Sequence, residues 1–143
     1  MALATVLLVD DEVPFVETMT KRLTRRELDI LPAHSGDEAL AQLSAHPNIE
    51  VVVLDVKMPG MDGIETLTEI KKHHPLKEVV MLTGHATVES AIDGMKKGAY
   101  DYLMKPCDID TLVSKVTEAA ARKRRQEEKI IEAQMKEITM RRT

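Results

Sequence analysis

Aromatic residues and cysteine are scarce in this sequence, and long apolar runs are missing. One Phe, two Tyr and no Trp occur among 143 residues, so a buried core has to be built from aliphatic side chains and methionine. The single cysteine, Cys107, cannot form an intramolecular disulfide, which is typical of proteins that fold in a reducing compartment. The apolar run 6–9 is too short for a signal peptide or a membrane span. We therefore predict a cytoplasmic protein that has no membrane partner.

The net charge of −4 is distributed unevenly along the chain. Residues 1–121 carry 12 Lys and Arg against 20 Asp and Glu, whereas residues 122–143 carry 8 against 4. An acidic body repels nucleic acid, so we predict no direct nucleic-acid binding by it. The basic cluster 122–125 could touch nucleic acid, yet no helix-turn-helix pattern follows it. We predict one compact domain over residues 1–121 and a charged helical extension over residues 122–143.

Short apolar runs alternate five times with segments of helical period. The predicted strands cover residues 6–9, 30–33, 51–54, 79–82 and 100–104. The helical segment after the fourth strand has its apolar residues at Val88, Ala91, Ile92 and Met95. Cap signals support the helices: Ser35 opens a capping box with Glu38, Asp62 can cap the next helix, and Gly98 ends the fourth. Continuous apolar runs favour parallel strands covered on both faces, so we predict an open, doubly wound α/β sheet.

Residues that can carry chemistry come directly after the predicted strands. Asp10 and Asp11 follow the first strand, Asp55 the third, Thr83 the fourth and Lys105 the fifth. A single Asp at a strand end is usually a turn residue or a helix cap. In the common strand order, however, the first and third strands are neighbours where ligands bind, which brings three carboxylates together. Two carboxylates about 4 Å apart repel by roughly 4 kcal/mol, so such a cluster holds a proton or a cation, and its oxygen ligands suit Mg²⁺.

Lys105 and Thr83 complete this edge of the predicted sheet. Lys105 precedes Pro106, and Lys-Pro at a strand end predicts a tight turn, for which a cis bond is one form, that would direct the ammonium group at the acidic cluster. Each residue also has an ordinary interpretation. Most lysines are solvated surface residues, and a threonine often ends a strand because it is β-branched.

Four motifs in this order resemble the CheY-like receiver domain of response regulators. They are Val9-Asp10-Asp11, Leu54-Asp55 with 58–63, Leu82-Thr83-Gly84, and 98–102 with Lys105-Pro106. Each motif is weak alone, but the ordered set is specific, and the resemblance covers about residues 4–121. Receivers of nitrogen-regulation-type transcription activators are the most similar members. The resemblance implies a flavodoxin-like (βα)5 fold with strand order 2-1-3-4-5, here with an extended C-terminal helix.

The resemblance also implies a two-component phosphoacceptor. Asp55 would accept a phosphoryl group from the phosphohistidine of a sensor histidine kinase or phosphotransfer protein, and Lys105 and Thr83 would bind phosphoryl oxygens. The domain would catalyse its own phosphorylation and dephosphorylation without being an enzyme of the classical kind. Such a transfer mainly needs positioning and neutralisation of charge on the phosphoryl oxygens.

The same resemblance implies a metal site beside the phosphoacceptor. Asp11 and Asp55 would ligate Mg²⁺ directly, the backbone carbonyl of Lys57 would be a third ligand, and Asp10 would act mainly through bound water. Lys57 and His85 would flank the path of the attacking water and so affect the lifetime of the phosphoryl group.

A switch between two conformations is the third implication. The phosphoryl group would draw Thr83 inward, and Tyr102 would fill the space that Thr83 leaves. The surface that changes would be formed by the helix 88–95, the strand 100–104 and the helix that begins at 109. It would control an output domain or a partner, and homodimers could form through this surface or through the C-terminal helix.

Three other functions share parts of the pattern. A phosphatase of the haloacid dehalogenase type would need an acid two residues after the nucleophile, where this chain has Lys57. A flavodoxin-like cofactor binder would need a loop rich in Ser, Thr and Gly after the first strand, where three acids stand here. A receiver that has lost phosphorylation and serves as a scaffold would lack some of the matched positions, and all are present.

The extension 122–143 contains neither Gly nor Pro and is rich in helix formers. As a helix it would be about 33 Å long. Ile131, Met135 and Ile138 follow a heptad-like spacing, but Arg124 and Glu128 occupy the earlier positions of that register. Two interpretations therefore stay open, a solvated and frayed extension or a dimerising linker toward an output domain.

Overall fold

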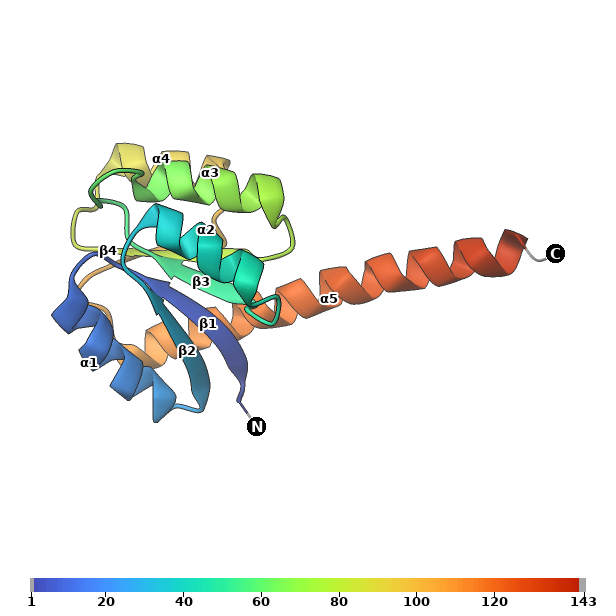
Figure 1. Ribbon diagram of the computed structural model, residues 1–143, viewed down its shortest axis with the longest axis horizontal. Helices are drawn as coiled ribbons and strands as arrows, with labels where there is room; N and C mark the ends of the chain where they lie inside the picture. Colours follow the sequence, from blue (N-terminus) through green and yellow to red (C-terminus); the bar gives the residue numbers. More distant parts are fainter. Residues whose placement is uncertain (1, 142–143) are drawn as a thin grey trace.

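The structure is a computed structural model that describes residues 2–141, in which strands and helices alternate along the chain (Figure 1). The elements are β1 (Ala4–Val9), α1 (Val13–Thr24), β2 (Leu28–Ala33), α2 (Gly36–Ala45), β3 (Val51–Leu54), α3 (Gly63–His73), β4 (Glu78–Thr83), α4 (Val88–Lys96), β5 (Asp101–Met104) and α5 (Ile109–Arg141). Each predicted strand is present, and four of the five differ from their predicted bounds by one or two residues at an end.

The five strands form one sheet in the order β2-β1-β3-β4-β5, and every neighbouring pair is parallel. The predicted fold and strand order are therefore confirmed. Val9 pairs with Leu54 across β1 and β3, and Thr83 pairs with Met104 across β4 and β5. This register brings the carboxyl ends of the four strands to one edge of the sheet, where the strand order reverses.

Two aliphatic cores lie on opposite faces of the sheet, because successive strand residues point to opposite sides. On one face Leu8 belongs to the core that includes Leu23 of α1 and Leu112 of α5. On the other face its neighbour Leu7 belongs to the core that includes Leu43 of α2 and Leu67 of α3, two helices that lie on the same face of the sheet in Figure 1. All six of these leucines are at most 1% exposed. Full burial of a leucine side chain contributes about 1.5–3 kcal/mol, so both faces of the sheet need a helical cover.

Side-chain caps begin several helices, as their sequences indicate. The Asp62 carboxylate accepts a hydrogen bond from the Glu65 amide at the start of α3 (2.9 Å). The Ser35 hydroxyl accepts one from the Glu38 amide at the start of α2 (3.1 Å). The predicted capping box at Ser35 is only half present, since the Glu38 carboxylate accepts from the amide of His34 instead of that of Ser35. The carboxylate therefore reaches one residue further back and ties the end of β2 to α2.

Helix α4 differs from the pattern that predicted it. Val88, Ile92 and Met95 are 79%, 50% and 47% exposed, so these apolar residues face away from the core. The residue of α4 that is fully buried is Gly94, and a Cβ built there would lie 3.6 Å from the ring of Tyr102. A glycine lets the helix backbone approach the sheet closely, which leaves the larger apolar side chains on the outside.

Helix α5 packs on the sheet and then continues away from it (Figure 1). Its buried residues end at Ala120, although the helix runs on to Arg141. The predicted helical extension over residues 122–143 is thus present as one uninterrupted element as far as Arg141, and residues 142–143 lie outside the described residues. Among the described residues, we find no helix that combines the length and the apolar character needed to span a membrane.

Candidate functional site

The site lies where the carboxyl ends of β1, β3, β4 and β5 meet. Backbone hydrogen bonds continue the sheet past these ends, from the Asp55 amide to the Val9 carbonyl (3.0 Å) and from the Lys105 amide to the Thr83 carbonyl (2.9 Å). Asp10 follows β1 and donates its amide to Ala33 of β2 (3.1 Å). The positions of these side chains are therefore set by the backbone ladder of the sheet rather than by mobile loops.

Three carboxylates meet at this edge. One oxygen atom each from Asp10, Asp11 and Asp55 can be chosen so that all lie within 4.8 Å of one another. Asp10 and Asp55 are buried, with 1% and 3% of their surface exposed, while Asp11 is partly exposed. Negative charges at this separation repel strongly when they are shielded from water, so the cluster requires compensating positive charge.

Lys105 supplies part of that charge through an ion pair with Asp10. Its Nζ atom donates to Asp10 Oδ2 at 2.6 Å and lies 3.9 Å from the centroid of the Phe15 ring. The second oxygen of Asp10 accepts from the amide of Glu12 at 2.9 Å. Both oxygens of Asp10 are thus engaged. The bond between Lys105 and Pro106 is cis.

Asp55 lies in surroundings that disfavour its charged form. Burial raises the pKa of Asp55 above its ordinary value, and the carboxylate of Asp10 acts in the same direction. The Thr83 hydroxyl, the charge of Lys105 and the Val56 amide, which donates to Asp55 Oδ1 at 2.8 Å, oppose this increase in the pKa without reversing it. A nearby cation would favour the ionised carboxylate.

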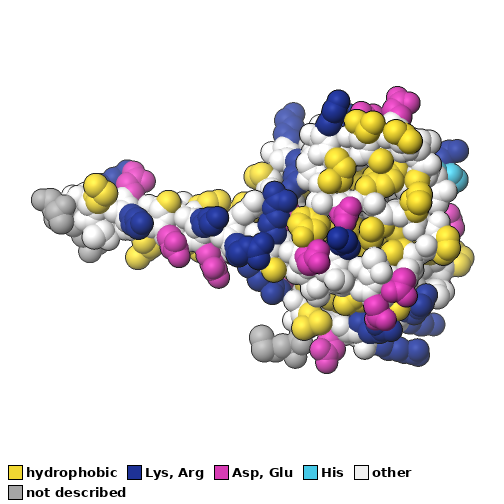
Figure 2. Space-filling model, turned by 180° about the vertical axis from the view of Figure 1, so that it is seen from behind, with side chains coloured by type: hydrophobic (Ala, Val, Ile, Leu, Met, Phe, Trp, Pro, Cys, Tyr) yellow, Lys and Arg dark blue, Asp and Glu magenta, His cyan; other side chains and the backbone are white. Residues whose placement is uncertain are grey.

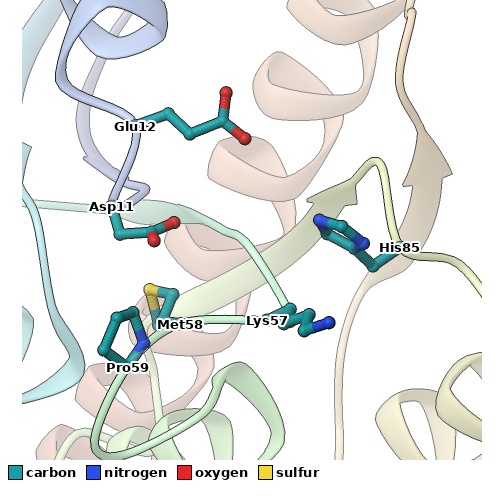
Figure 3. A pocket seen from close by; sticks show the side chains of 6 residues that line it. All are labelled: Asp11, Glu12, Lys57, Met58, Pro59 and His85. Carbon is teal, nitrogen blue, oxygen red and sulfur yellow. The ribbon is translucent and has the colours of Figure 1, made fainter.

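An open pocket of about 370 Å³ adjoins the acidic cluster (Figure 3). Its walls come from three loops, which follow β1, β3 and β4. They are formed by Asp11, Glu12, Lys57, Met58, Pro59 and His85. We find no hydrogen bond or ion pair between the carboxylate of Asp11 and another described side chain. Because the donors are carboxylate oxygens and the pocket is open to water, the site fits a hard cation such as Mg²⁺ that keeps several water ligands.

A comparison with known proteins identifies the family of the chain that carries this site. Residues 6–117 match the family model described as the response regulator receiver domain. This chain belongs to that family.

The receiver is similar to the amino-acid sequence of the DNA-binding transcriptional regulator NtrC from Klebsiella pneumoniae, with 35% identity over 121 residues. These residues are 85% of this chain and 26% of NtrC, so the chain spans about a quarter of that relative's length. Among solved structures, it is similar to a response regulator receiver domain protein from Clostridium thermocellum (36% identity, TM-score 0.81, 85% of this chain and 97% of that one). It is also similar to a chain of the CheX-CheY-BeF3-Mg complex from Borrelia burgdorferi (33% identity, TM-score 0.75, 80% and 87%).

Receiver domains generally bind Mg²⁺ at an acidic pocket, and in this receiver the cluster of Asp10, Asp11 and Asp55 occupies the corresponding edge of the sheet. Lys105 also lies at this edge, next to Asp10. Lys57 lines the pocket with Asp11. The residues that the sequence singles out for phosphoryl and metal chemistry are thus neighbours in the fold.

The two residues predicted to form the switch lie on adjacent strands of the receiver. Thr83 is fully buried, and its hydroxyl accepts a hydrogen bond from the His85 amide (3.0 Å). Tyr102 is half-buried, and its hydroxyl lies 2.6 Å from Ser90 Oγ. Ser90 and Thr87 form the reciprocal capping box at the start of α4. The Tyr102 hydroxyl therefore bonds to the residue that caps α4.

Three contacts of the site have no clear signal in the sequence. His34 Nδ1 lies 3.2 Å from the Asp10 carbonyl oxygen, and Phe15 lies under the Lys105 ammonium group. Gly63 is the third, since a Cβ built on it would lie 2.0 Å from the carbonyl oxygen of Asp55. Each pairs residues from different elements, and a local pattern does not report such contacts. The glycine belongs to the motif 58–63, but the motif does not say why glycine is needed.

Proposed function

We propose that this receiver accepts a phosphoryl group on Asp55 with the help of bound Mg²⁺. The observation that carries the proposal is the meeting of three carboxylates within 4.8 Å beside a lysine ammonium group that is paired with Asp10. Such a site holds the nucleophile, the metal ligands and a cation for the phosphoryl oxygens together. The phosphoryl donor would be a phosphohistidine of a sensor histidine kinase or of a phosphotransfer protein.

In the proposed transfer, a carboxylate oxygen of Asp55 attacks the phosphorus atom. The bond between phosphorus and the partner's imidazole nitrogen breaks, and the imidazole leaves with the bonding electrons. Lys105, held close by Asp10, pairs with a phosphoryl oxygen, and the Thr83 hydroxyl donates to another. Positioned charges of this kind stabilise the transition state because they need no reorganisation during the reaction.

Asp11, Asp55 and the Lys57 backbone carbonyl would hold Mg²⁺, and Asp10 would contact it mainly through water. When bound, the ion neutralises charge on the phosphoryl oxygens. The free carboxylate of Asp11 and the open pocket beside it support this assignment. The Borrelia burgdorferi complex, whose title names beryllofluoride and Mg²⁺, supports it further, because beryllofluoride has the shape of a phosphoryl group.

We further propose that phosphorylation changes the surface formed by α4, β5 and α5. Figure 2 shows apolar side chains gathered on the body of the molecule as it is seen from behind. On α4 and β5, Val88, Ile92 and Met104 are 79%, 50% and 65% exposed. Exposed apolar groups gathered on one face are typical of a binding surface. The partner would be an output domain, a second receiver or another protein. Residues 1–121 would form the receiver and residues 122–143 a linker, and a homodimer could use this face or the C-terminal helix.

The first test is the intact mass of the chain after incubation with acetyl phosphate, with and without Mg²⁺, beside Asp55→Asn. We expect the wild-type chain to gain one phosphoryl group only when Mg²⁺ is present, and the variant to gain none. Lys105→Ala should bind Mg²⁺ and still gain much less phosphoryl. Phosphorylation of Asp55→Asn to the wild-type level would refute the assignment of the nucleophile. Equal phosphorylation after chelation of all divalent cations would refute the role of the metal.

A further inference from the structure

The base of the sheet, opposite the acidic cluster, carries two carboxylates that are largely shielded from water. Glu50 precedes β3 and Glu78 begins β4, and their side chains are 14% and 5% exposed. Carboxylates in such positions need positively charged or hydrogen-bonding partners, because removing an unpaired charge from water is costly. Both receive partners from α5, in the turn directly after its last buried residue.

Arg124 pairs with Glu50 through two hydrogen bonds. Its Nε and Nη2 atoms donate to the two carboxylate oxygens, each at 2.7 Å, and Nη2 also donates to the carbonyl oxygen of Leu3 at 2.9 Å. A two-bond pair between guanidinium and carboxylate fixes the relative orientation of the groups as well as their distance. Arg124 therefore joins α5 to the residues that precede β1 and β3.

Arg122, two residues earlier on α5, reaches the second carboxylate. Its Nε atom lies 3.4 Å from Glu78 Oε2, while Lys71 of α3 pairs with Glu78 Oε1 at 3.0 Å. The Arg122 guanidinium group also lies 5.8 Å from the centroid of the Tyr100 ring. Glu78 thus keeps Lys71 as an ion-pair partner if Arg122 is lost. Glu50 has no second ion-pair partner among the described residues if Arg124 is lost. The Arg124 contact is the more important of the two.

The basic cluster 122–125 is therefore not a uniformly solvated patch. Figure 2 shows Lys and Arg side chains gathered where the helix leaves the rest of the molecule. Arg122 and Arg124 are paired with the body, and Lys123 pairs with Glu127 within the helix (2.6 Å). Arg125 is exposed, and we find no ion pair between it and another described residue. Adjacent arginines thus differ in role, and Arg125 provides a matched control.

We propose that Arg122 and Arg124, with their partners Glu50 and Glu78, form an anchor that fixes the direction in which α5 leaves the receiver. We call these four residues the basal anchor. Apolar packing of α5 ends at Ala120, and the walls of the cleft beside the α3–β4 loop include Lys123 and Glu127. Beyond that turn the helix is exposed. The last contacts that orient it are thus ionic, and the segment 128–141 moves with the receiver as one body while the anchor is closed.

This inference does not depend on phosphorylation of Asp55, so the two proposals can fail separately. The test is a distance distribution measured by pulsed electron paramagnetic resonance on the full chain. Spin labels are attached at Lys72→Cys on α3 and Lys136→Cys on the projecting helix, in a Cys107→Ser background. The distance distribution of this labelled background is compared with that of the double variant, in which Arg122 and Arg124 are both replaced by Ala. Arg125→Ala is the control.

We expect a narrow distribution in the labelled background and in Arg125→Ala, and a distribution at least twice as wide in the double variant. Glu50→Gln should widen the distribution as well, because it removes the charge of the carboxylate while keeping its size. Helical circular dichroism and a cooperative urea unfolding transition of each variant show that the fold is retained. A distribution that is equally narrow in the double variant would overturn the proposal, and so would one that is already broad in the labelled background.

Discussion

Thr20 of α1 is a residue whose environment does not match its chemistry. Its hydroxyl oxygen is buried and has no hydrogen-bond partner. Among the described residues, no other buried side-chain oxygen or nitrogen lacks one. A hydroxyl removed from water without a partner costs about 1–3 kcal/mol. Thr20 is partly buried and follows Met19, which belongs to the core beneath α1, so an apolar side chain of the same size suits the position.

We therefore expect Thr20→Val to stabilise the receiver. Valine has nearly the same shape and a similar helix propensity, and it has no group that needs a partner. The free energy of unfolding in urea should rise by about 1 kcal/mol. Thr20→Ser is the control, since it keeps the hydroxyl and loses a methyl group, and it should lower the stability. If the valine variant were less stable than the wild type, the hydroxyl would have a partner in solution.

Gly63 is constrained by how closely the chain passes the backbone of Asp55. Its amide donates to the Val56 carbonyl at 2.7 Å, and an added Cβ would lie 2.0 Å from the Asp55 carbonyl oxygen and 2.7 Å from Val56 Cα. Both clashes are with backbone, so the loop after β3 would have to move. This glycine is needed for close approach, which is a requirement of space and not of backbone angle.

We expect Gly63→Ala to lower the free energy of unfolding by about 1–3 kcal/mol, the usual effect of overpacking. It should also slow phosphorylation by acetyl phosphate, because the displaced loop carries Asp55. Gly84→Ala is the control for stability, since the nearest atom to its added Cβ is Lys105 Cδ at 3.9 Å. Unfolding transitions and initial phosphorylation rates measure the two effects, and equal values for Gly63→Ala and wild type would contradict the steric argument.

At the scale of the elements, the strands could be predicted from sequence and the environment of α4 could not. A parallel strand such as Val51–Leu54 is apolar along its whole length because both faces are covered, and this signal is local. The pattern of Val88, Ile92 and Met95 also predicts a helix, but it does not distinguish a face that packs in the core from an apolar face that stays exposed. Gly94 decides which side approaches the sheet, and its effect depends on Tyr102, which belongs to another element.

The basal anchor could not be predicted for a similar reason. The bonds from Arg124 cross 74 positions to Glu50 and 121 positions to Leu3. In the sequence, Arg122 and Arg124 belong to a run of basic residues, and a charge run usually indicates a solvated face. The site at the other end of the sheet was more accessible to prediction, since the ends of parallel strands necessarily meet at one edge.

The pair between Glu50 and Arg124 makes the stability of the receiver depend on pH. Burial alone would raise the pKa of Glu50, but the hydrogen bonds and charge of Arg124 more than offset this effect, and the pKa is lowered from its ordinary value of 4.5. A lowered pKa in the folded state means that the contribution to stability is fully present above pH 4.5. It is lost as the pH falls through the pKa of the folded state, because the unfolded chain takes up the proton first.

We expect the difference in unfolding free energy between wild type and Glu50→Gln to be constant from pH 6 to 7. The difference should shrink as the pH falls below about 4.5. Urea unfolding at several pH values measures it, and Glu128→Gln on the exposed part of α5 is a matched control that should show a smaller dependence. A difference that grows on acidification would have the wrong sign for a carboxylate whose pKa is lowered.

At the scale of the whole molecule, we expect the acidic cluster to link the proposed metal binding to stability. Three carboxylates within 4.8 Å repel one another in the folded chain, whereas Asp55 moves away from Asp10 and Asp11 when the chain unfolds. A cation that binds only the folded state raises stability in proportion to the logarithm of its concentration. The receiver should therefore be least stable when divalent cations are removed, even though Lys105 neutralises part of the cluster.

We expect Asp11→Asn to separate these effects. Without metal, the variant should be about 1 kcal/mol more stable than the wild type, because one repelling charge at a partly exposed position is gone. With millimolar Mg²⁺, the wild type should gain stability and the variant should gain much less. Thermal unfolding with chelator and with Mg²⁺ measures both, and Asp29→Asn in β2 is a control outside the cluster. An equal response of wild type and Asp11→Asn to Mg²⁺ would contradict the assignment of Asp11.

Because α5 projects away from the sheet, a small tilt at its base becomes a large displacement at its far end. Between Ala121 and Arg141 the helix is about 30 Å long at 1.5 Å per residue. A tilt of roughly 10° about the base of the sheet would displace its far end by about 5 Å, which is one turn of an α-helix. A shift too small to change the packing around Leu112 could therefore change which residues of a partner meet Ile138. The exposed apolar side chains near the far end, Met135, Ile138 and Met140, are the ones that such a displacement would move farthest.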